Sequence, residues 1–403
     1  MSEQEQAVGR TSLAARVAGA PAVPVEVPAA DEEWAEGIPR GFARVYYGDG
    51  PPGIRRPVVM ADGFNLGRSD LDWLYQGLDG TFPLITTLRR LGRTVILLGF
   101  DERTAPITIN AQAAIEVIRR TVENQIGTDP LTVGGFSMGG LITRYALARM
   151  EHENIPHRTA LYFSYDTPHR GGHIPVGIQA FAHFIPGPEN DFAVQMNSPA
   201  AKEMMWRHYD SEDGTIRRHP DRDEFLEQLR AVGEWPVGPR KIGVANGSGE
   251  GMPIPVEPGE IALTVDGLLF PGTTFRIQAT GDDVTVAELV RTLPPAREVV
   301  TTSGFPEIDG APGGTLDSYR IIAEALRENG GLVDLRKPTV CFVPTVSAVA
   351  IRDLDDQDDL YAKVNALDPN ESELDEFLCS STTTPHTAVT EELCTWILDR
   401  LPD

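Results

Sequence analysis

The sequence predicts an α/β protein with a mostly parallel central sheet, flanking helices and an inserted helical lid. Short, wholly apolar runs such as Thr94 to Phe100 (TVILLGF) are typical of strands that are buried on both faces. Longer segments with apolar residues at helical spacing lie between them, and Ile109 to Ile126 is the clearest. Strands that alternate with helices in this order form parallel sheets.

The N-terminal part predicts an arm followed by two early strands. Residues 1–40 are rich in Ala, Pro, Val and Glu, and their prolines forbid a long helix. We expect an extended, partly disordered arm there, or alternatively a wrap along the sheet edge that is anchored by Trp34. The candidate strands are Gly41 to Tyr47 (GFARVYY) and Arg56 to Ala61 (RPVVMA).

The segment from Leu131 to Arg144, LTVGGFSMGGLITR, contains the most informative motif of the chain. A short apolar run leads into the G-x-S-x-G pentapeptide Gly135 to Gly139, and an apolar helical pattern follows. Strand, sharp turn and helix are the context of a nucleophile elbow, in which the serine sits on a strained turn and its hydroxyl projects from the sheet. The glycines leave room for strand and helix to approach closely. Ser137 is therefore the candidate nucleophile.

Residues 174–238 predict the lid. They follow the apolar strand Thr159 to Tyr165, which ends in Asp166, and they carry helical patterns rich in aromatic residues and methionine. Three of these side chains are candidates for contact with substrate, although they could equally only attach the lid to the core: Met196, Met205 and Trp206.

The remaining sequence predicts a return to the core. Lys241 to Gly247 resumes the sheet, and Ile261 to Thr280 has the alternation of a β-hairpin. We expect a variable stretch at 281–315, a last core strand at Thr339 to Pro344 and a terminal helix at Glu391 to Leu401. The predicted domains are the arm at 1–40, the core at 41–173 and 239–403, and the lid at 174–238.

Two segments carry a resemblance to a known family. GGFSMGGLITRYALA resembles the elbow of the lipase and esterase branch of the α/β-hydrolases, and Asp166 to Gly171 (DTPHRG) is similar to the T-P-H-x-G stretch of bacterial lipases and GPI-inositol deacylases. The resemblance implies the α/β-hydrolase fold and backbone oxyanion-hole donors at Met138 and Phe64. The alternative for the second donor is an ordinary turn at Asp62-Gly63.

The family's order of triad residues, serine then acid then histidine, identifies the remaining catalytic candidates. His386 lies beyond the last predicted strand, in a polar loop before the terminal helix, where the family places its base. Asp166 is the preferred acid because it stands at the carboxyl end of a predicted strand. The alternatives that stay open are Asp282, Asp283 and Glu250.

Composition excludes several classes of function. The charge balance is 35 − 59 = −24, which repels nucleic acid. The sequence lacks zinc-binding spacing and nucleotide-binding motifs, so we expect no metal and no cofactor. No run reaches transmembrane length, and the N-terminus lacks the pattern of a signal peptide, so we expect a cytoplasmic protein. The preference for arginine over lysine indicates a bacterial origin.

Together these features favour a serine hydrolase. We expect it to cleave a small-molecule carboxylic ester that has an apolar acyl or aromatic group, through a Ser-His-Asp triad and an acyl-enzyme. The alternatives are an acyltransferase, thioesterase or macrocyclase with the same triad, and a non-catalytic scaffold that binds a ligand. The oligomeric state is not predicted.

Overall fold

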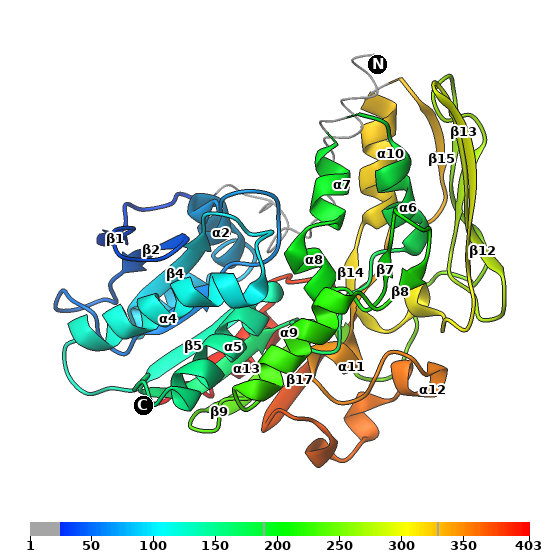
Figure 1. Cartoon of the computed structure of the whole chain (residues 1–403). Helices are drawn as coiled ribbons and strands as arrows, with labels where there is room; N and C mark the ends of the chain where they lie inside the picture. The colour runs from blue at the N-terminus through cyan, green and yellow to red at the C-terminus, as the bar shows by residue number, and fades with distance from the viewer. Residues whose placement is uncertain (1–24, 188–189, 329) are drawn as a thin grey trace.

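Eight strands form the main sheet of the computed structural model, which describes residues 25–187, 190–328 and 330–403 (Figure 1). β2 runs antiparallel to both of its neighbours, β1 and β4. All other neighbouring strands of this sheet are parallel. In spatial order the strands are β1 (Glu32–Trp34), β2 (Gly41–Tyr46), β4 (Val95–Phe100), β3 (Val58–Ala61), β5 (Leu131–Phe136), β6 (Thr159–Tyr165), β9 (Arg240–Ser248) and β17 (Glu376–Ser380). This order, with one reversed strand, confirms the predicted fold class. The chain has the α/β-hydrolase fold.

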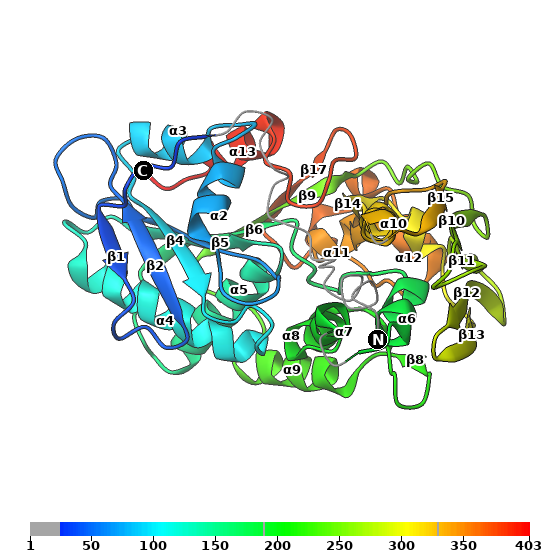
Figure 2. The same cartoon turned by 90° about the horizontal axis from the view of Figure 1, so that it is seen from above.

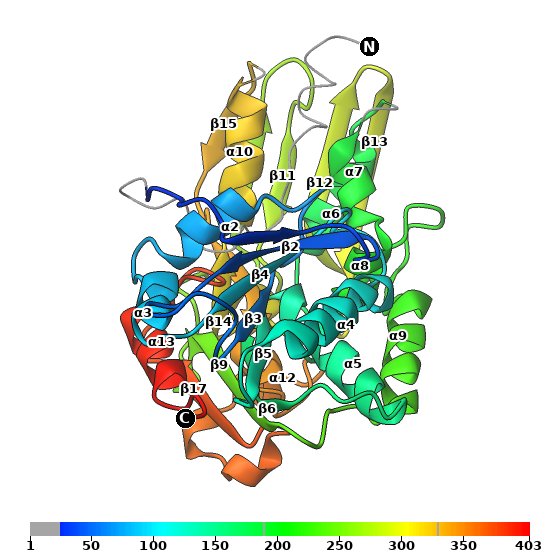
Figure 3. The ribbon, with the colours of Figure 1, turned by 90° about the vertical axis from the view of Figure 1, so that its left-hand side faces the viewer.

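Helices cover both faces of the main sheet (Figure 3). One face carries α2 (Leu71–Leu78), α3 (Leu84–Arg90) and α13 (Glu391–Leu398), whose apolar residues form one buried cluster with that face. The other face carries α4 (Ile107–Asn124) and α5 (Met138–His152), which belong to a second cluster. The central strands β4 and β5 are buried along their whole length because helices cover them on both sides.

The N-terminal edge of the sheet is an extended segment that pairs with it. β1 pairs antiparallel with β2, and the indole of Trp34 at its end is buried. Residues 31–34 therefore pair along the sheet edge, as in the wrap that we weighed as the alternative. Residues 1–24 of the predicted arm lie outside the described residues.

Residues 174–238 form short helices with one small hairpin, and they stand between the main sheet and a second sheet (Figures 1 and 2). α8 contacts the core helix α4, whereas α6 contacts the second sheet. The elements are α6 (Val176–Phe184), α7 (Asp191–Met196), α8 (Pro199–Met204), β7 (His208–Tyr209), β8 (Ile216–Arg217) and α9 (Pro220–Ala231).

The second sheet is the largest departure from the sequence prediction. It is antiparallel, in the order β13-β12-β11-β10-β15, and it occupies residues that we assigned to the core or to a variable stretch. Only the hairpin at its start was foreseen. Its strands are β10 (Ile261–Asp266), β11 (Thr273–Arg276), β12 (Val284–Thr292), β13 (Pro295–Thr302) and β15 (Leu332–Leu335), and α10 (Ser318–Glu328) contacts it.

The prediction that Thr339 to Pro344 forms the last strand of the core sheet is wrong. Val340–Pro344 forms β16, which pairs with β14 (Gly313–Leu316) in a separate two-stranded sheet, and β17 is the last strand of the main sheet. An apolar run shows that a strand is buried, but it does not show which sheet the strand joins. Short helical turns complete this part of the chain: η1 (Ile308–Gly310), α11 (Thr345–Ala348), α12 (Gln357–Leu360), η2 (Val364–Ala366) and η3 (Pro369–Glu371).

None of the described helices combines the length and the apolar character that crossing a membrane requires. No group of three or more potential ligands for a metal ion occurs among the same residues. The three cysteines are free and buried.

Candidate active site

Ser137 lies on a strained turn between β5 and α5. Its φ of 55° and ψ of −126° place a non-glycine residue in a sparsely populated region, as a nucleophile elbow requires. The turn is possible because its neighbours are small. A Cβ on Gly135 would lie 2.3 Å from the carbonyl carbon of Gly139, and a Cβ on Gly139 would lie 2.4 Å from the carbonyl oxygen of Ala61. Both predicted close approaches are therefore present.

His386 and Asp166 form a buried pair, although 220 positions separate them in the sequence. Nδ1 of His386 lies 2.6 Å from Oδ2 of Asp166, and both side chains are almost fully buried. A carboxylate only accepts hydrogen bonds, so Nδ1 carries the proton and donates it. The other carboxylate oxygen accepts the backbone N–H of Asn246 at 2.9 Å. Asp166 is thus held by two donors at the end of β6.

The structure brings the carboxylate–histidine pair and the elbow to the same edge of the main sheet. The N–H of Ser137 donates to the carbonyl of Tyr165 at 2.9 Å, one residue before Asp166. The ring of Phe342 packs edge-on against the His386 imidazole at 4.7 Å. Among the described residues, Nε2 of His386 has no hydrogen-bond partner. In a neutral imidazole with its proton on Nδ1, that nitrogen carries the lone pair.

The other candidate acids lie elsewhere in the described chain. Asp282 and Asp283 are exposed in the turn before β12 of the second sheet. Glu250 is exposed as well, and its carboxylate accepts a hydrogen bond from the amide of Asn365 at 2.7 Å. Of the four candidates, only Asp166 is brought to His386.

Asn246 is a residue of this site that the sequence interpretation missed. It lies near the end of β9, and its side-chain amide donates to the Thr384 hydroxyl at 2.8 Å and to the Ala388 carbonyl at 3.0 Å. These two contacts lie on either side of His386. Together with its backbone bond to Asp166, they tie the acid to the loop of the base. No local pattern marked Asn246, because its partners lie 138 and 142 positions away in the sequence.

The two predicted oxyanion-hole donors lie on segments that adjoin each other, the start of α5 and the loop after β3. Met138 is the first residue of α5, and the N–H groups of a first helical turn have no partner within the helix. Phe64 is buried in the loop after β3, and the start of α5 abuts that loop at Ala61 and Asp62. Burial raises the pKa of Asp62, and the guanidinium of Arg103 opposes that rise.

The three predicted substrate contacts are all buried within residues 174–238. Met196 ends α7, and its carbonyl faces Nε2 of His208 at 2.9 Å. Met205 bridges to Gly172, and the Trp206 indole donates to Asp355 at 2.9 Å. The Met205 and Trp206 contacts attach residues 174–238 to the core, which was one of the two roles that we weighed, whereas the Met196 contact lies within the segment. Contact with substrate stays a prediction for all three.

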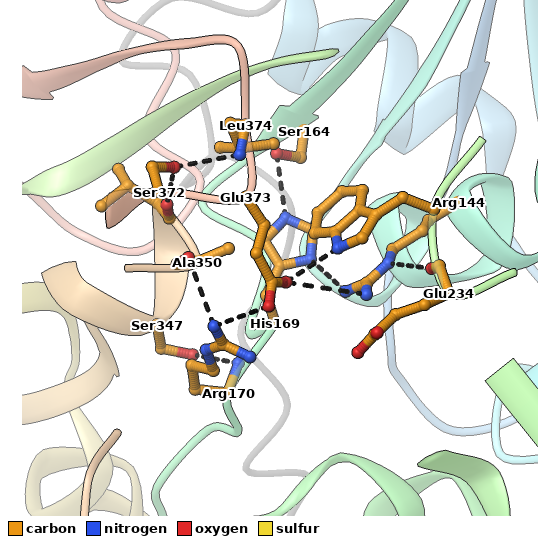
Figure 4. Close-up of polar contacts among 12 residues, drawn as sticks. Arg144, Ser164, His169, Arg170, Glu234, Ser347, Ala350, Ser372, Glu373 and Leu374 are labelled. Carbon is orange, nitrogen blue, oxygen red and sulfur yellow. Dashed lines mark hydrogen bonds and ion pairs between the residues drawn. The ribbon is translucent and has the colours of Figure 1, made fainter. Parts of the chain in front are cut away.

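The T-P-H segment lies in a buried polar network (Figure 4). Nε2 of His169 lies 3.1 Å from the Ser164 hydroxyl, and its Nδ1 lies 3.4 Å from Nη1 of Arg144. An arginine only donates, so Nδ1 accepts and Nε2 carries the proton. Burial, and then the charges of Arg144 and Arg170, hold the pKa of His169 well below its usual value. His169 is therefore neutral, and it fixes the loop rather than exchanging protons.

Glu373 connects this network to the segment that leads into β17. Its carboxylate accepts from Arg170 at 2.9 Å and from the indole of Trp235 at 2.7 Å, and it lies three residues before β17 (Figure 4). The network therefore joins α5, the loop after β6 and the approach to β17. These segments lead to or from Ser137, Asp166 and His386.

A second histidine–aspartate pair lies in the same part of the molecule. Nε2 of His173 is 2.7 Å from Oδ1 of Asp309, and both side chains are almost fully buried. The backbone N–H of Gln278 donates to the other carboxylate oxygen at 2.8 Å. Nδ1 of His173 has no partner among the described residues. Sequence spacing gave no sign of this pair, because 136 positions separate its members.

Comparison with known proteins finds similarity only at the level of structure, since neither family models nor the sequences of characterised proteins match the chain. Similar solved structures include the mature lipase BlEst2 of Bacillus licheniformis, with 13% identity, 51% of this chain and 72% of that chain covered, and a TM-score of 0.34. The esterase of Pyrobaculum calidifontis has 13% identity, with 54% and 67% covered and a TM-score of 0.33. A bacterial heroin esterase has 14% identity, with 53% and 65% covered and a TM-score of 0.32. The fold assignment rests on the strand order described above.

Proposed function

We propose that this protein is a serine hydrolase that cleaves a carboxylic ester through an acyl-enzyme intermediate. The observation that carries the proposal is the buried pair of His386 and Asp166 at 2.6 Å, at the same sheet edge as the strained turn of Ser137. A serine hydroxyl needs an adjacent base to act as a nucleophile near neutral pH. A histidine that donates through Nδ1 to a carboxylate offers Nε2 for that task.

In the proposed reaction, Oγ of Ser137 attacks the ester carbonyl while Nε2 of His386 takes its proton. The N–H groups of Met138 and Phe64 would stabilise the negative charge that develops on the carbonyl oxygen. His386 then protonates the leaving alcohol, and the acyl group stays on Ser137. A water molecule, deprotonated by the same nitrogen, releases the acid. Asp166 keeps the imidazole in the required tautomer and stabilises its protonated form.

The lid bears on the substrate class. Its buried side chains are mainly apolar, and Met196, Met205 and Trp206 are the members that we propose to line the acyl or aromatic side of the substrate. Ser137 itself is only 4% exposed. Such burial also supports acyl transfer as the second candidate function, because a site that excludes water can admit another nucleophile. Product analysis with an added alcohol or amine separates transfer from hydrolysis.

Turnover of a short p-nitrophenyl ester tests the proposal. We expect Ser137→Ala to lower kcat/KM by a factor on the order of 10⁶, because triad members act as a unit. Ser318→Ala is a matched control, since Ser318 is buried and its hydroxyl has no hydrogen-bond partner among the described residues. The control should keep its activity. A folded Ser137→Ala variant with wild-type turnover would refute the assignment.

A further inference from the structure

Three segments meet at one end of the second sheet, which is the upper end in Figure 1. Asp266 at the end of β10 pairs with Leu332 at the start of β15. The hydroxyl of Thr292 at the end of β12 donates to the carbonyl of Leu268 at 2.6 Å. The turn after β10, the turn after β12 and the start of β15 therefore lie side by side.

Each of these segments presents an exposed leucine. The exposed fractions are 90% for Leu268, 63% for Leu293 and 69% for Leu332. We call these three residues, with the exposed Pro294 and Pro295, the leucine tip. Single exposed apolar residues are common on soluble proteins, but adjacent ones on neighbouring turns indicate a surface that is covered in use.

The segments that form the leucine tip contain no charged residue, in a chain of which 23% is charged, and the nearest charged group is the guanidinium of Arg291, which donates to the Pro294 carbonyl at 2.8 Å. No Asp, Glu, Lys or Arg occurs at 267–275, 292–296 or 330–333. Charged residues resume at the borders of these segments, with Asp266, Arg291 and Arg297. An uncharged apolar tip with polar borders suits a boundary between water and an apolar phase.

We propose that the leucine tip docks the protein onto an electrically neutral lipid surface by inserting its three leucines among the head groups. A second copy of the chain is a poorer occupant. Three leucines of about 100 Å² each offer about 300 Å², well below the roughly 800 Å² per partner of a stable protein interface. Shallow insertion into lipid needs no matching surface. The net charge of −24 opposes an anionic bilayer, so the lipid is neutral or zwitterionic.

Binding to phosphatidylcholine vesicles, measured by flotation, tests this inference without reference to catalysis. We expect the triple variant Leu268→Ser, Leu293→Ser and Leu332→Ser to bind at least about tenfold more weakly than the wild type. The matched control replaces three exposed apolar residues away from the tip: Leu91→Ser, Val237→Ser and Met252→Ser. It should bind like the wild type. Equal binding by the two triple variants would overturn the proposal.

Two further measurements distinguish the occupants. Exchanging part of the phosphatidylcholine for phosphatidylserine should weaken binding, and added salt should restore it. Stronger binding to the anionic vesicles would contradict the proposal. A Leu268→Trp reporter, which leaves the other tip residues intact, should shift its emission to shorter wavelength on contact with neutral vesicles. A shift that instead follows protein concentration without lipid would show a dimer surface and overturn the lipid assignment.

Discussion

The molecule contains two buried histidine–aspartate pairs, which use opposite ring nitrogens of the histidine for the hydrogen bond. His386 meets Asp166 through Nδ1 at 2.6 Å and leaves Nε2 unpaired among the described residues. His173 meets Asp309 through Nε2 at 2.7 Å and leaves Nδ1 unpaired in the same part of the chain. In both pairs, a backbone N–H holds the second carboxylate oxygen.

The two pairs have different surroundings, and this difference indicates which of them we expect to take part in catalysis. Asp166 follows Tyr165, whose carbonyl accepts the N–H of Ser137, so the first pair is joined to a strained elbow. The His173 ring instead packs edge-on against the Trp206 indole at 6.4 Å, between the lid and the segment of Asp309. We therefore expect the first pair to act in the reaction and the second to hold the structure together.

The largest effect on catalysis should come from removing the imidazole of His386, with removal of the His173 imidazole as the comparison. We expect His386→Ala to lower kcat/KM on a p-nitrophenyl ester by a factor on the order of 10⁶, because the serine loses its base. His173→Ala should change it by less than about tenfold in the folded fraction, since triad chemistry does not pass through it. The comparison fails if the folded His173→Ala variant is the more impaired of the two.

Replacing the two aspartates should separate an effect on kcat from an effect on the free energy of unfolding. Asp166→Asn should lower kcat by a factor on the order of 10⁴, because an amide does not enforce the required tautomer of His386. Asp309→Asn should leave kcat near the wild-type value but lower the free energy of unfolding by about 3 kcal/mol, as expected for a broken buried pair. Urea unfolding measures the free energy of unfolding of both variants, and steady-state kinetics measures their kcat. An exchange of the two phenotypes would reverse the roles assigned here.

Glu203 extends the comparison to a buried carboxylate held by a backbone amide instead of a histidine. It lies on α8 and accepts the N–H of Ile107 at the start of α4, at 2.6 Å, so it joins lid to core. Burial raises its pKa from 4.5 to about 7. The folded protein then binds more protons between these values, so the free energy of unfolding falls as pH rises through that window.

Replacing this carboxylate by a neutral amide removes that pH dependence. Relative to Glu203→Gln, the wild type should lose stability by an amount on the order of 3 kcal/mol between pH 4.5 and pH 8. Urea unfolding of both proteins across this range measures the difference. A difference that stays constant with pH would show that the carboxylate ionises in the folded state as it does in water.

Asn246 should give the smallest effect. Its side chain holds the loop on both sides of His386, so Asn246→Ala should lower kcat by about 10- to 100-fold through misplacement of the base. Gln278→Ala is the matched control at the second pair, because its side chain bonds to Ala279 and Thr302 and not to a catalytic loop. The control should retain kcat. Equal losses in the two variants would remove the positioning role.

The parts of the site that could be predicted from sequence are those with local signals. The elbow of Ser137 is one continuous segment of strand, turn and helix, so its motif could be recognised in the sequence. His386 followed from chain order alone. The acid stayed open among four residues because its contact spans 220 positions, and no local pattern encodes which strand end meets a distant loop. The pair of His173 and Asp309 escaped for the same reason.

The fold divides in a similar way. The buried parallel strands of the main sheet were recognised from their apolar runs. β12 was missed because it alternates only partly, and β13 was missed because it is exposed along one face. β16 was recognised as a strand but assigned to the wrong sheet, since burial does not reveal its partner. β17 was missed because three of its five residues are only partly buried.

Covalent labelling with a fluorophosphonate tests the central claim most directly. The reagent forms an adduct only with an activated nucleophile, so it reads the combined effect of Ser137, His386 and Asp166 without any assumption about the natural ester. Peptide mapping should place a single adduct on Ser137, and the His386→Ala variant should be labelled far more slowly while His173→Ala is labelled at the wild-type rate. A folded protein that takes up no label, or takes it up on another residue, would contradict the account.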